Sequence, residues 1–322
     1  MSNLDRTPAL STCGGRAGVA AEPVRDLIPG RMVMLGESTK VRRLLPTLGR
    51  RMVGAWCFID HYGPDDIARE DGMQVPPHPH TGLQTVSWLH AGEVLHRDSL
   101  GSRQMLRPGQ LGIMTAGRAI AHSEESPREH SAILHGAQLW VALPEGHRHT
   151  APAFEHHPEL PQVSGGGLQA TVILGEVDGA ASPGTTFSPL VGADLTLTSG
   201  SDARLPLEPD FEYAMLTMSG EAEVDGVRVE PGSLLYLGSH RSDLRLQSSG
   251  DARLLLLGGE PFAEEIVMWW NFVARTGEEV AAARAEWNAG TGGFGEVHGY
   301  DGDRLLAPAM PATTLKPRGR AR

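Results

Sequence analysis

The sequence predicts an all-β protein made of two antiparallel β-barrels with one helix near the C-terminus. Three observations support this fold class. The chain has 322 residues, roughly two lengths of ~150 residues, the size usual for one domain. Its 40 Gly and 23 Pro are an excess of turn-forming residues that favours many short strands over long helices. Finally, apolar runs of five to ten residues recur between Gly-containing turns, as strands of a sandwich or barrel do.

The N-terminal residues 1–25 are expected to form a flexible arm. They contain few apolar side chains and several small or helix-breaking residues, so they can bury little surface. They also carry acidic residues and prolines and lack the continuous apolar segment of a secretory signal. No apolar run of 18 residues occurs in the sequence. We therefore expect a cytoplasmic protein that makes no contact with a membrane.

The two barrels are expected at residues 26–158 and 159–300. Strand-like runs of the first barrel include AWCFIDHY, LQTVSWLH, EVLHRDSL and LHGAQLWVAL, and Pro and Gly interrupt the pattern between Phe154 and Gly167. Both halves then share one order of elements, namely Gly-Glu, strand, Gly, strand, Pro-Gly, strand. Two copies of one barrel is the simplest interpretation. The alternative is that such turns are common to all β-barrels.

One helix is predicted at residues 277–288. Thr276 and Glu279 form a capping box, Val280, Ala283 and Trp287 follow helical spacing, and Gly290 is placed to end the helix. Residues 301–322 are a Pro-rich, basic tail that we expect to be a frayed, solvated terminus.

Charge and cysteine content exclude several classes of function. The formal net charge of −11 argues against direct nucleic-acid binding. The two cysteines, Cys13 and Cys57, cannot build a disulfide framework. Cys57 lies in an apolar run and is expected to be a small buried hydrophobe. We expect a monomer.

Two pairs of residues have the spacing of metal ligands on strands. His78 and His80 are one residue apart, and His122 and Glu124 repeat that spacing about forty residues later. Alternate residues of a strand face the same side, so facing strands would bring three imidazoles and one carboxylate to one point. This donor set suits divalent iron, manganese, cobalt, nickel, copper or zinc, whereas calcium would need more oxygen ligands. Four protein ligands leave one or two open positions for chemistry on an octahedral ion.

The remaining candidate residues are less distinctive. A single His-x-His pair is also typical of solvated or hydrogen-bonded histidines, so the prediction depends on having two pairs. His96 and Asp98 alternate on a neighbouring strand and either orient a ligand imidazole or face solvent. Asp60, His61 and Tyr62 precede a Gly-Pro turn, and this position suggests the mouth of the barrel.

These segments resemble a known family. The stretches HPHTGLQTVSWLHAGEVLHRDSLG and RPGQLGIMTAGRAIAHSE are similar to the HPHxG and TAGRGxxHSE-like strands of the pirin family in the cupin superfamily. GGEPFAEEIVMWWNFV is similar to the closing segment of that family, and the resemblance covers about residues 30–312. The resemblance implies a bicupin, which is a protein of two jelly-roll barrels. It also implies one metal ion, most suitably Fe(II), held by His78, His80, His122 and Glu124. The second barrel has no such pair and is expected to be metal-free.

The resemblance also implies a function. Some pirins are similar in activity to quercetin 2,3-dioxygenases, so the first hypothesis is cleavage of a small aromatic substrate such as a flavonol by dioxygen. Glu124 would act as the base, and Gln84, which stands where the wider cupin pattern has Glu, would orient water or substrate. The second hypothesis is an iron-dependent, redox-sensing regulator that binds a partner protein. A third is a barrel with adventitious metal.

Overall fold

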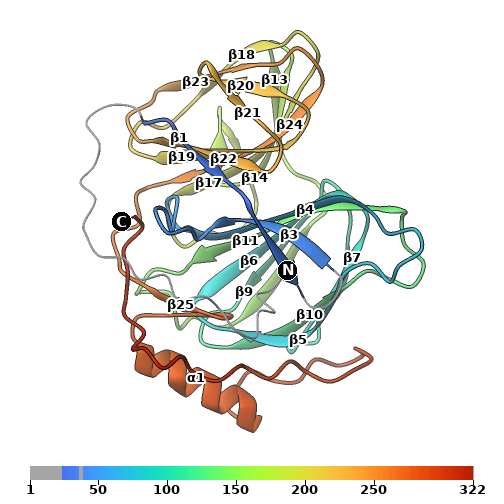
Figure 1. The fold of residues 1–322 in the computed structure, drawn as a ribbon, viewed down its shortest axis with the longest axis vertical. Coiled ribbons are helices and arrows are strands. Elements are labelled where there is room, and N and C mark those ends of the chain that lie inside the picture. Colours follow the sequence, from blue (N-terminus) through green and yellow to red (C-terminus); the bar gives the residue numbers. More distant parts are fainter. Residues whose placement is uncertain (1–23, 36–38, 322) are drawn as a thin grey trace.

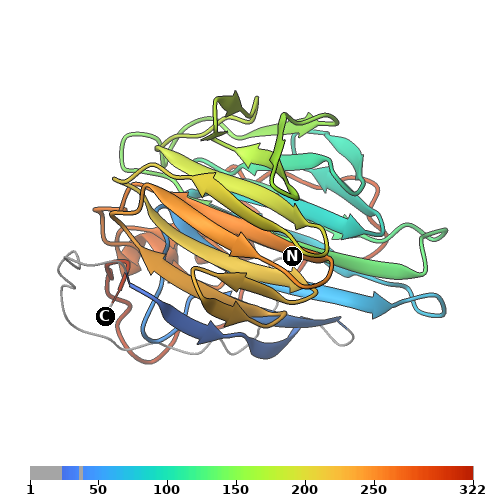
Figure 2. The same ribbon diagram turned by 90° about the horizontal axis from the view of Figure 1, so that it is seen from above.

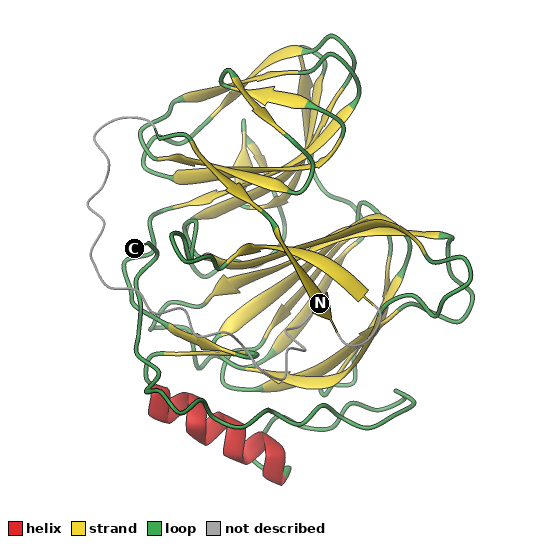
Figure 3. Cartoon of the chain, in the orientation of Figure 1, coloured by secondary structure: helices red, strands yellow, loops and turns green. Residues whose placement is uncertain are grey.

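The computed structural model describes residues 24–35 and 39–321 of the chain. Most of the predicted N-terminal arm lies outside the described residues. In the described part, strands dominate and one helix is present (Figure 3). Within it, no helix is both long enough and apolar enough to cross a membrane.

The first barrel consists of two antiparallel sheets (Figure 1). The larger sheet has the order β12 (Ala153–His157), β9 (Leu111–Thr115), β6 (Leu83–Ala91), β11 (Ile133–Ala142), β4 (Trp56–Asp66), β3 (Thr39–Leu45) and β2 (Arg31–Leu35). The smaller sheet has the order β5 (Gln74–His80), β10 (Ile120–Glu125), β7 (Val94–Asp98) and β8 (Arg103–Leu106).

The second barrel has the same architecture. Its larger sheet has the order β1 (Asp26–Pro29), β22 (Ser233–Gly238), β19 (Glu212–Ser219), β24 (Ala252–Gly259), β17 (Leu190–Leu197), β14 (Leu168–Leu174) and β13 (Gln162–Gly165). Its smaller sheet has the order β18 (Asp202–Pro206), β23 (Asp243–Gln247), β20 (Ala222–Val224) and β21 (Val227–Val229). Two hairpins complete the strands, β15 (Glu176–Val177) with β16 (Ala180–Ala181) and β25 (Val267–Trp269) with β26 (Phe272–Ala274).

The strand orders confirm that the two halves are copies of one topology. The run β9-β6-β11-β4 in the first barrel corresponds to β22-β19-β24-β17 in the second, and β5-β10-β7-β8 corresponds to β18-β23-β20-β21. Each of these eight strands of the second barrel follows its counterpart by the same number of strands. Turns shared by all barrels would not produce this match, so the all-β, bicupin fold predicted from the sequence is confirmed.

Both ends of the described chain cross between the barrels. Strand β1 pairs with β22 of the second barrel, although it precedes the first barrel in sequence (Figure 2). In the opposite direction, β25, β26 and the helix pack on the first barrel, where Phe272 and Trp287 join Ala119 and Ala121 in one apolar cluster. The first barrel is therefore closed by residues that follow the second.

The helix α1 (Gly277–Ala289) agrees with its prediction. Thr276 is the N-cap and accepts a hydrogen bond from the Glu279 backbone N–H, while Gly290 ends the helix in the left-handed conformation. The tail after it differs from its prediction. The backbone carbonyl of Arg320 accepts hydrogen bonds from the N–H groups of Arg51 (2.8 Å) and Met52 (3.1 Å), so the end of the tail is held against the first barrel rather than frayed.

A continuous apolar core joins the two barrels. The Trp56 indole Nε1 donates hydrogen bonds to the carbonyls of Val191 and Gly258, both at 3.1 Å. Cys57 next to it is fully buried, as expected of a small hydrophobe. Because the core is shared, the two barrels are packed as one body.

Candidate metal centre

Three histidines come together inside the first barrel. His78 and His80 lie on β5 and His122 lies on the adjacent β10, where it pairs directly with His78. One ring nitrogen from each lies within 4.8 Å of the others, and all three side chains are buried. Ring centroids are 4.3 Å apart for His78 and His122 and 5.0 Å apart for His80 and His122. The period of two along a strand thus places both histidines of β5 on one face.

Backbone carbonyls fix the tautomers of the two β5 histidines. His78 Nδ1 lies 2.7 Å from the carbonyl oxygen of Pro76, and His80 Nδ1 lies 3.0 Å from that of Asn271. A carbonyl oxygen only accepts hydrogen bonds, so Nδ1 carries the proton in both rings. The ring lone pair that can ligate a cation is therefore on Nε2 in both residues.

A side-chain relay orients the third histidine. The Asp98 carboxylate accepts from His96 Nε2 at 3.1 Å, and its other oxygen accepts from the backbone N–H groups of Leu100 and Ser102. His96 Nδ1 is consequently the acceptor for His122 Nδ1, 3.5 Å away, and the lone pair of His122 is on Nε2. His96 and Asp98 are buried, so of the two roles considered for them, the solvent-facing one is excluded.

The donor atoms fit a cation. His80 Nε2 and His122 Nε2 lie only 3.1 Å apart, and both present lone pairs, which cannot hydrogen-bond to each other. Burial lowers the pKa of His78 to about 4 and lowers the pKa of His80 and His122 well below the usual value. At neutral pH these imidazoles are uncharged, which is the form that ligates transition metals.

Glu124 is buried nearby but is not part of this group of donors. The pairing of β10 with β5 shifts register here, because His122 pairs with His78 but Glu124 pairs with Val75, so the extra residue lies on β5 while β10 keeps its regular pairing with β7. Glu124 Oε1 accepts a hydrogen bond from Ser87 Oγ at 2.9 Å, and Ser87 Oγ is also 2.9 Å from Gln138 Oε1. Its role as the fourth ligand stays a prediction.

Gln84 is buried on β6 and contacts the second half of the chain. Its Nε2 donates to Thr115 Oγ1 at 3.0 Å and to the carbonyl oxygen of Thr185 at 3.1 Å. The amide thus joins the first barrel to the segment after β16. Its role in orienting water or substrate stays a prediction.

Sequence reasoning did not identify the contact from Asn271. This residue lies in the turn between β25 and β26, and Trp270 beside it has a positive φ of 52°. The hairpin is attached to β5 by a bridge between Thr81 and Phe272. No spacing rule links Asn271 to a histidine 191 positions away. The only sequence signal for this contact was the similarity of GGEPFAEEIVMWWNFV to the closing segment of the pirin family.

The residues predicted at the barrel mouth are buried and have partners in the first barrel. Asp60 is buried in an ion pair with Arg43, with N···O distances of 2.9 and 2.8 Å. His61 Nε2 lies 3.0 Å from His135 Nε2, also buried. These side chains are buried on β4, and their contribution to a pocket at the barrel mouth stays a prediction.

In the second barrel, the counterparts of β5 and β10 are β18 and β23. The buried side chains of these strands are Ala203, Leu205, Leu244 and Leu246. None of the four carries an atom that ligates a metal. Aliphatic packing takes the place of the histidines there.

Comparison with known proteins places the chain in a family. The family model described as Pirin matches residues 38–141, and the model described as Pirin C-terminal cupin domain matches residues 192–294. A "Pirin-like protein" of Caulobacter vibrioides is 38% identical over 78% of this chain and 88% of its own. The chain belongs to the pirin family.

Two further pirin relatives carry the name of an enzyme. A Pseudomonas aeruginosa protein named "Putative quercetin 2,3-dioxygenase PA1205" is 48% identical over 90% of this chain and 92% of its own. A crystal structure of quercetin 2,3-dioxygenase from Acinetobacter baumannii superposes with a TM-score of 0.87 at 42% identity, covering 90% of this chain and 97% of that one. This chain and the Acinetobacter baumannii protein thus share one fold along nearly the whole length of both chains.

Proposed function

We propose that this protein is a metal-dependent dioxygenase that cleaves quercetin-type flavonols or a related enolizable aromatic, with one transition-metal ion, Fe(II) for preference. The observation that carries the proposal is the convergence of three buried histidines, each with a ring nitrogen within 4.8 Å of the others. The similarity to proteins named as quercetin 2,3-dioxygenases supports the choice of substrate class and of dioxygen as co-substrate.

His78, His80 and His122 would hold the metal, with Glu124 as the fourth ligand. A bound transition metal supplies Lewis acidity and an open coordination position. The carbonyls of Pro76 and Asn271 and the ring of His96 keep the three imidazoles in the ligating tautomer. The edge of the His80 ring also faces Trp140, with centroids 5.1 Å apart, which limits its rotation.

Glu124 is the proposed base for the substrate hydroxyl. It is a carboxylate, so it can accept a proton, whereas the amide of Gln84 cannot. The hydrogen bond from Ser87 to Oε1 holds one oxygen in place. The buried surroundings exclude bulk water, which strengthens the effect of a single charge. Gln84 and His96 would assist by hydrogen bonding.

Oxygen uptake by the metal-loaded protein with quercetin tests the proposal. Glu124→Gln keeps the side-chain volume but removes the basicity, so we expect turnover to fall by ~10²–10⁴ while part of the metal is retained. Glu296→Gln, an exposed change, is the matched control. Metal content is measured for each variant. Near-normal turnover of Glu124→Gln at equal metal content would refute the role of base. No oxygen uptake by the metal-loaded wild type with flavonols or with other enolizable aromatics would refute the dioxygenase and leave the regulatory hypothesis.

A further inference from the structure

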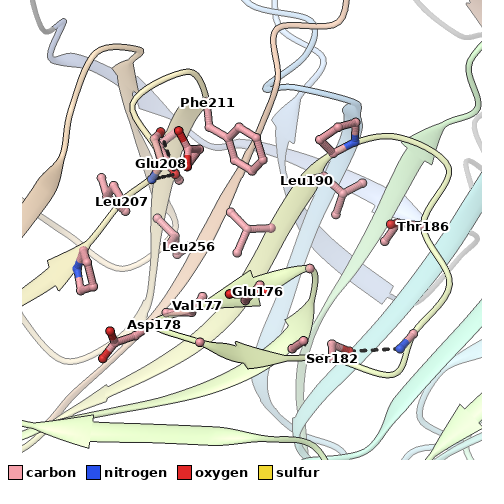
Figure 4. Close-up of a pocket in the computed structure, with 18 residues that line it drawn as sticks. Glu176, Val177, Asp178, Ser182, Thr186, Leu190, Leu207, Glu208, Phe211 and Leu256 are labelled. Atoms are coloured by element: carbon pink, nitrogen blue, oxygen red, sulfur yellow. Dashed lines mark hydrogen bonds between the residues drawn. The ribbon is translucent and has the colours of Figure 1, made fainter.

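The second barrel contains a cavity of about 690 Å³ that the proposed reaction does not use. It lies between the β15–β16 hairpin, the segment that follows this hairpin, and the turn before β19 (Figure 4). Leu256 of β24 lies between these walls (Figure 4). Cavities of ~300–1,000 Å³ at barrel mouths are typical of small-molecule sites.

The walls combine apolar and acidic side chains. Val177, Leu190, Leu207, Phe211 and Leu256 contribute apolar surface. Glu176, Asp178 and Glu208 also line the cavity, and the described residues that line it include no Lys, Arg or His. Glu208 and Phe211 lie on one side, and Glu176 and Asp178 lie on the other (Figure 4).

Among the described residues, none of the three carboxylates forms an ion pair with a basic side chain. Within the part of the chain that the structure describes, the ion pairs formed by acidic residues of this barrel involve Asp194, Asp202, Glu212, Glu221, Asp225 and Asp243. The cavity therefore has a negative potential beside an apolar surface, with the ring of Phe211 available for a cation–π contact.

A wall separates this cavity from the histidines of the first barrel. Gly184 and Thr186 line the cavity, and the carbonyl oxygen of Thr185 between them accepts the hydrogen bond from Gln84. A Cβ at Gly184 would lie 2.6 Å from Leu174 Cδ2 and 3.0 Å from Leu111 Cδ2. The segment is thus packed tightly between the barrels, and the cavity is a distinct site.

We propose that this cavity binds a small organic cation, a protonated amine that carries an aromatic or branched aliphatic group. The ammonium group pairs with the carboxylates, and the apolar group packs on Leu256 and Phe211. An anionic ligand, such as an ionised flavonol, is disfavoured by the same three charges. The site does not depend on the metal centre or on the proposed dioxygenase activity.

Three probes of similar size and different charge test the proposal. Binding of 2-phenylethylammonium, 2-phenylethanol and 3-phenylpropionate to the full chain is measured by calorimetry, with amide chemical shifts to locate the site. We expect the cation to bind most tightly, more weakly as salt is raised, and to shift residues 176–190 and 207–211. Equal binding of all three probes, binding of the anion in preference, or no binding of the cation at millimolar concentration would overturn the proposal.

Variants of the lining residues extend the test. Glu208→Gln and Asp178→Asn should each weaken binding of the cation by about two- to fivefold. The triple change with Glu176→Gln should weaken it more than tenfold. Glu230→Gln, an exposed change in the same barrel away from the cavity, is the control and should leave binding unchanged. Because the three acids are exposed, the variants are expected to fold. Unchanged binding in the triple variant would refute the site.

Discussion

The relay from Asp98 through His96 to His122 predicts a specific loss of metal affinity. The His96 ring stacks on Phe154, with centroids 4.1 Å apart and an interplanar angle of 10°. His96→Phe keeps an aromatic ring for this stack but removes both nitrogens, so it deletes the acceptor of His122 Nδ1–H. The free ring of His122 can then adopt the other tautomer, in which Nε2 carries the proton and cannot ligate.

The magnitude follows from the contact that is lost. Outer hydrogen-bond partners of ligating histidines are worth about 10- to 100-fold in metal affinity, or about 1.4–2.7 kcal/mol. The 3.5 Å distance between the two Nδ1 atoms is long for a hydrogen bond. We therefore expect a loss near the lower end, about tenfold, and a similar or smaller loss for Asp98→Asn.

Competition between the protein and a chelator for Co(II) measures this affinity, and the visible absorption of the bound ion reports its coordination. His298→Ala, a change at an exposed histidine, controls for the loss of an imidazole. Thermal unfolding of the metal-free variants shows whether the barrel is intact. An affinity of His96→Phe within twofold of wild type, with the fold intact, would show that His96 does not set the tautomer of His122.

Three further predictions concern stability and reactivity. Burial raises the pKa of the Cys57 thiol to about 12. We therefore expect Cys57 to resist a thiol reagent in the native protein and to react on unfolding. Rapid labelling of the native protein would contradict the buried position of Cys57. Burial lowers the pKa of His61 to about 3 and of His135 to about 4, both below the unfolded value near 6.5. The unfolded state therefore binds more protons below pH 6.5, and the free energy of unfolding should fall by about 1.4 kcal/mol per pH unit for each histidine as pH drops towards 4. Urea unfolding of wild type and His61→Phe at pH 7 and 5 checks this, and equal pH slopes would count against it. Trp287 is buried on the helix, and its indole N–H donates to the Leu305 carbonyl at 2.7 Å. Trp287→Ala should therefore lower the free energy of unfolding by about 3–5 kcal/mol in the same assay. A loss below about 1 kcal/mol would show that the helix contributes little to stability.

The features predicted correctly from the sequence are those set by short-range rules. Alternation along a strand places His78 and His80 on one face, and turn residues mark the repeated strands of the two barrels. The capping box at Thr276 fixes the start of the helix within a few residues. Each of these depends on backbone geometry over fewer than ten residues, so the sequence by itself determined them.

Tertiary structure decided what lies between distant segments. The carbonyl of Asn271 reaches His80 because a hairpin from beyond the second barrel packs on the first. Strand β1 pairs in the second barrel, and the cavity beside Gly184 forms where segments between residues 175 and 256, far apart in sequence, meet. Such contacts follow from how apolar faces pack together across long stretches of chain, and no local pattern records that choice.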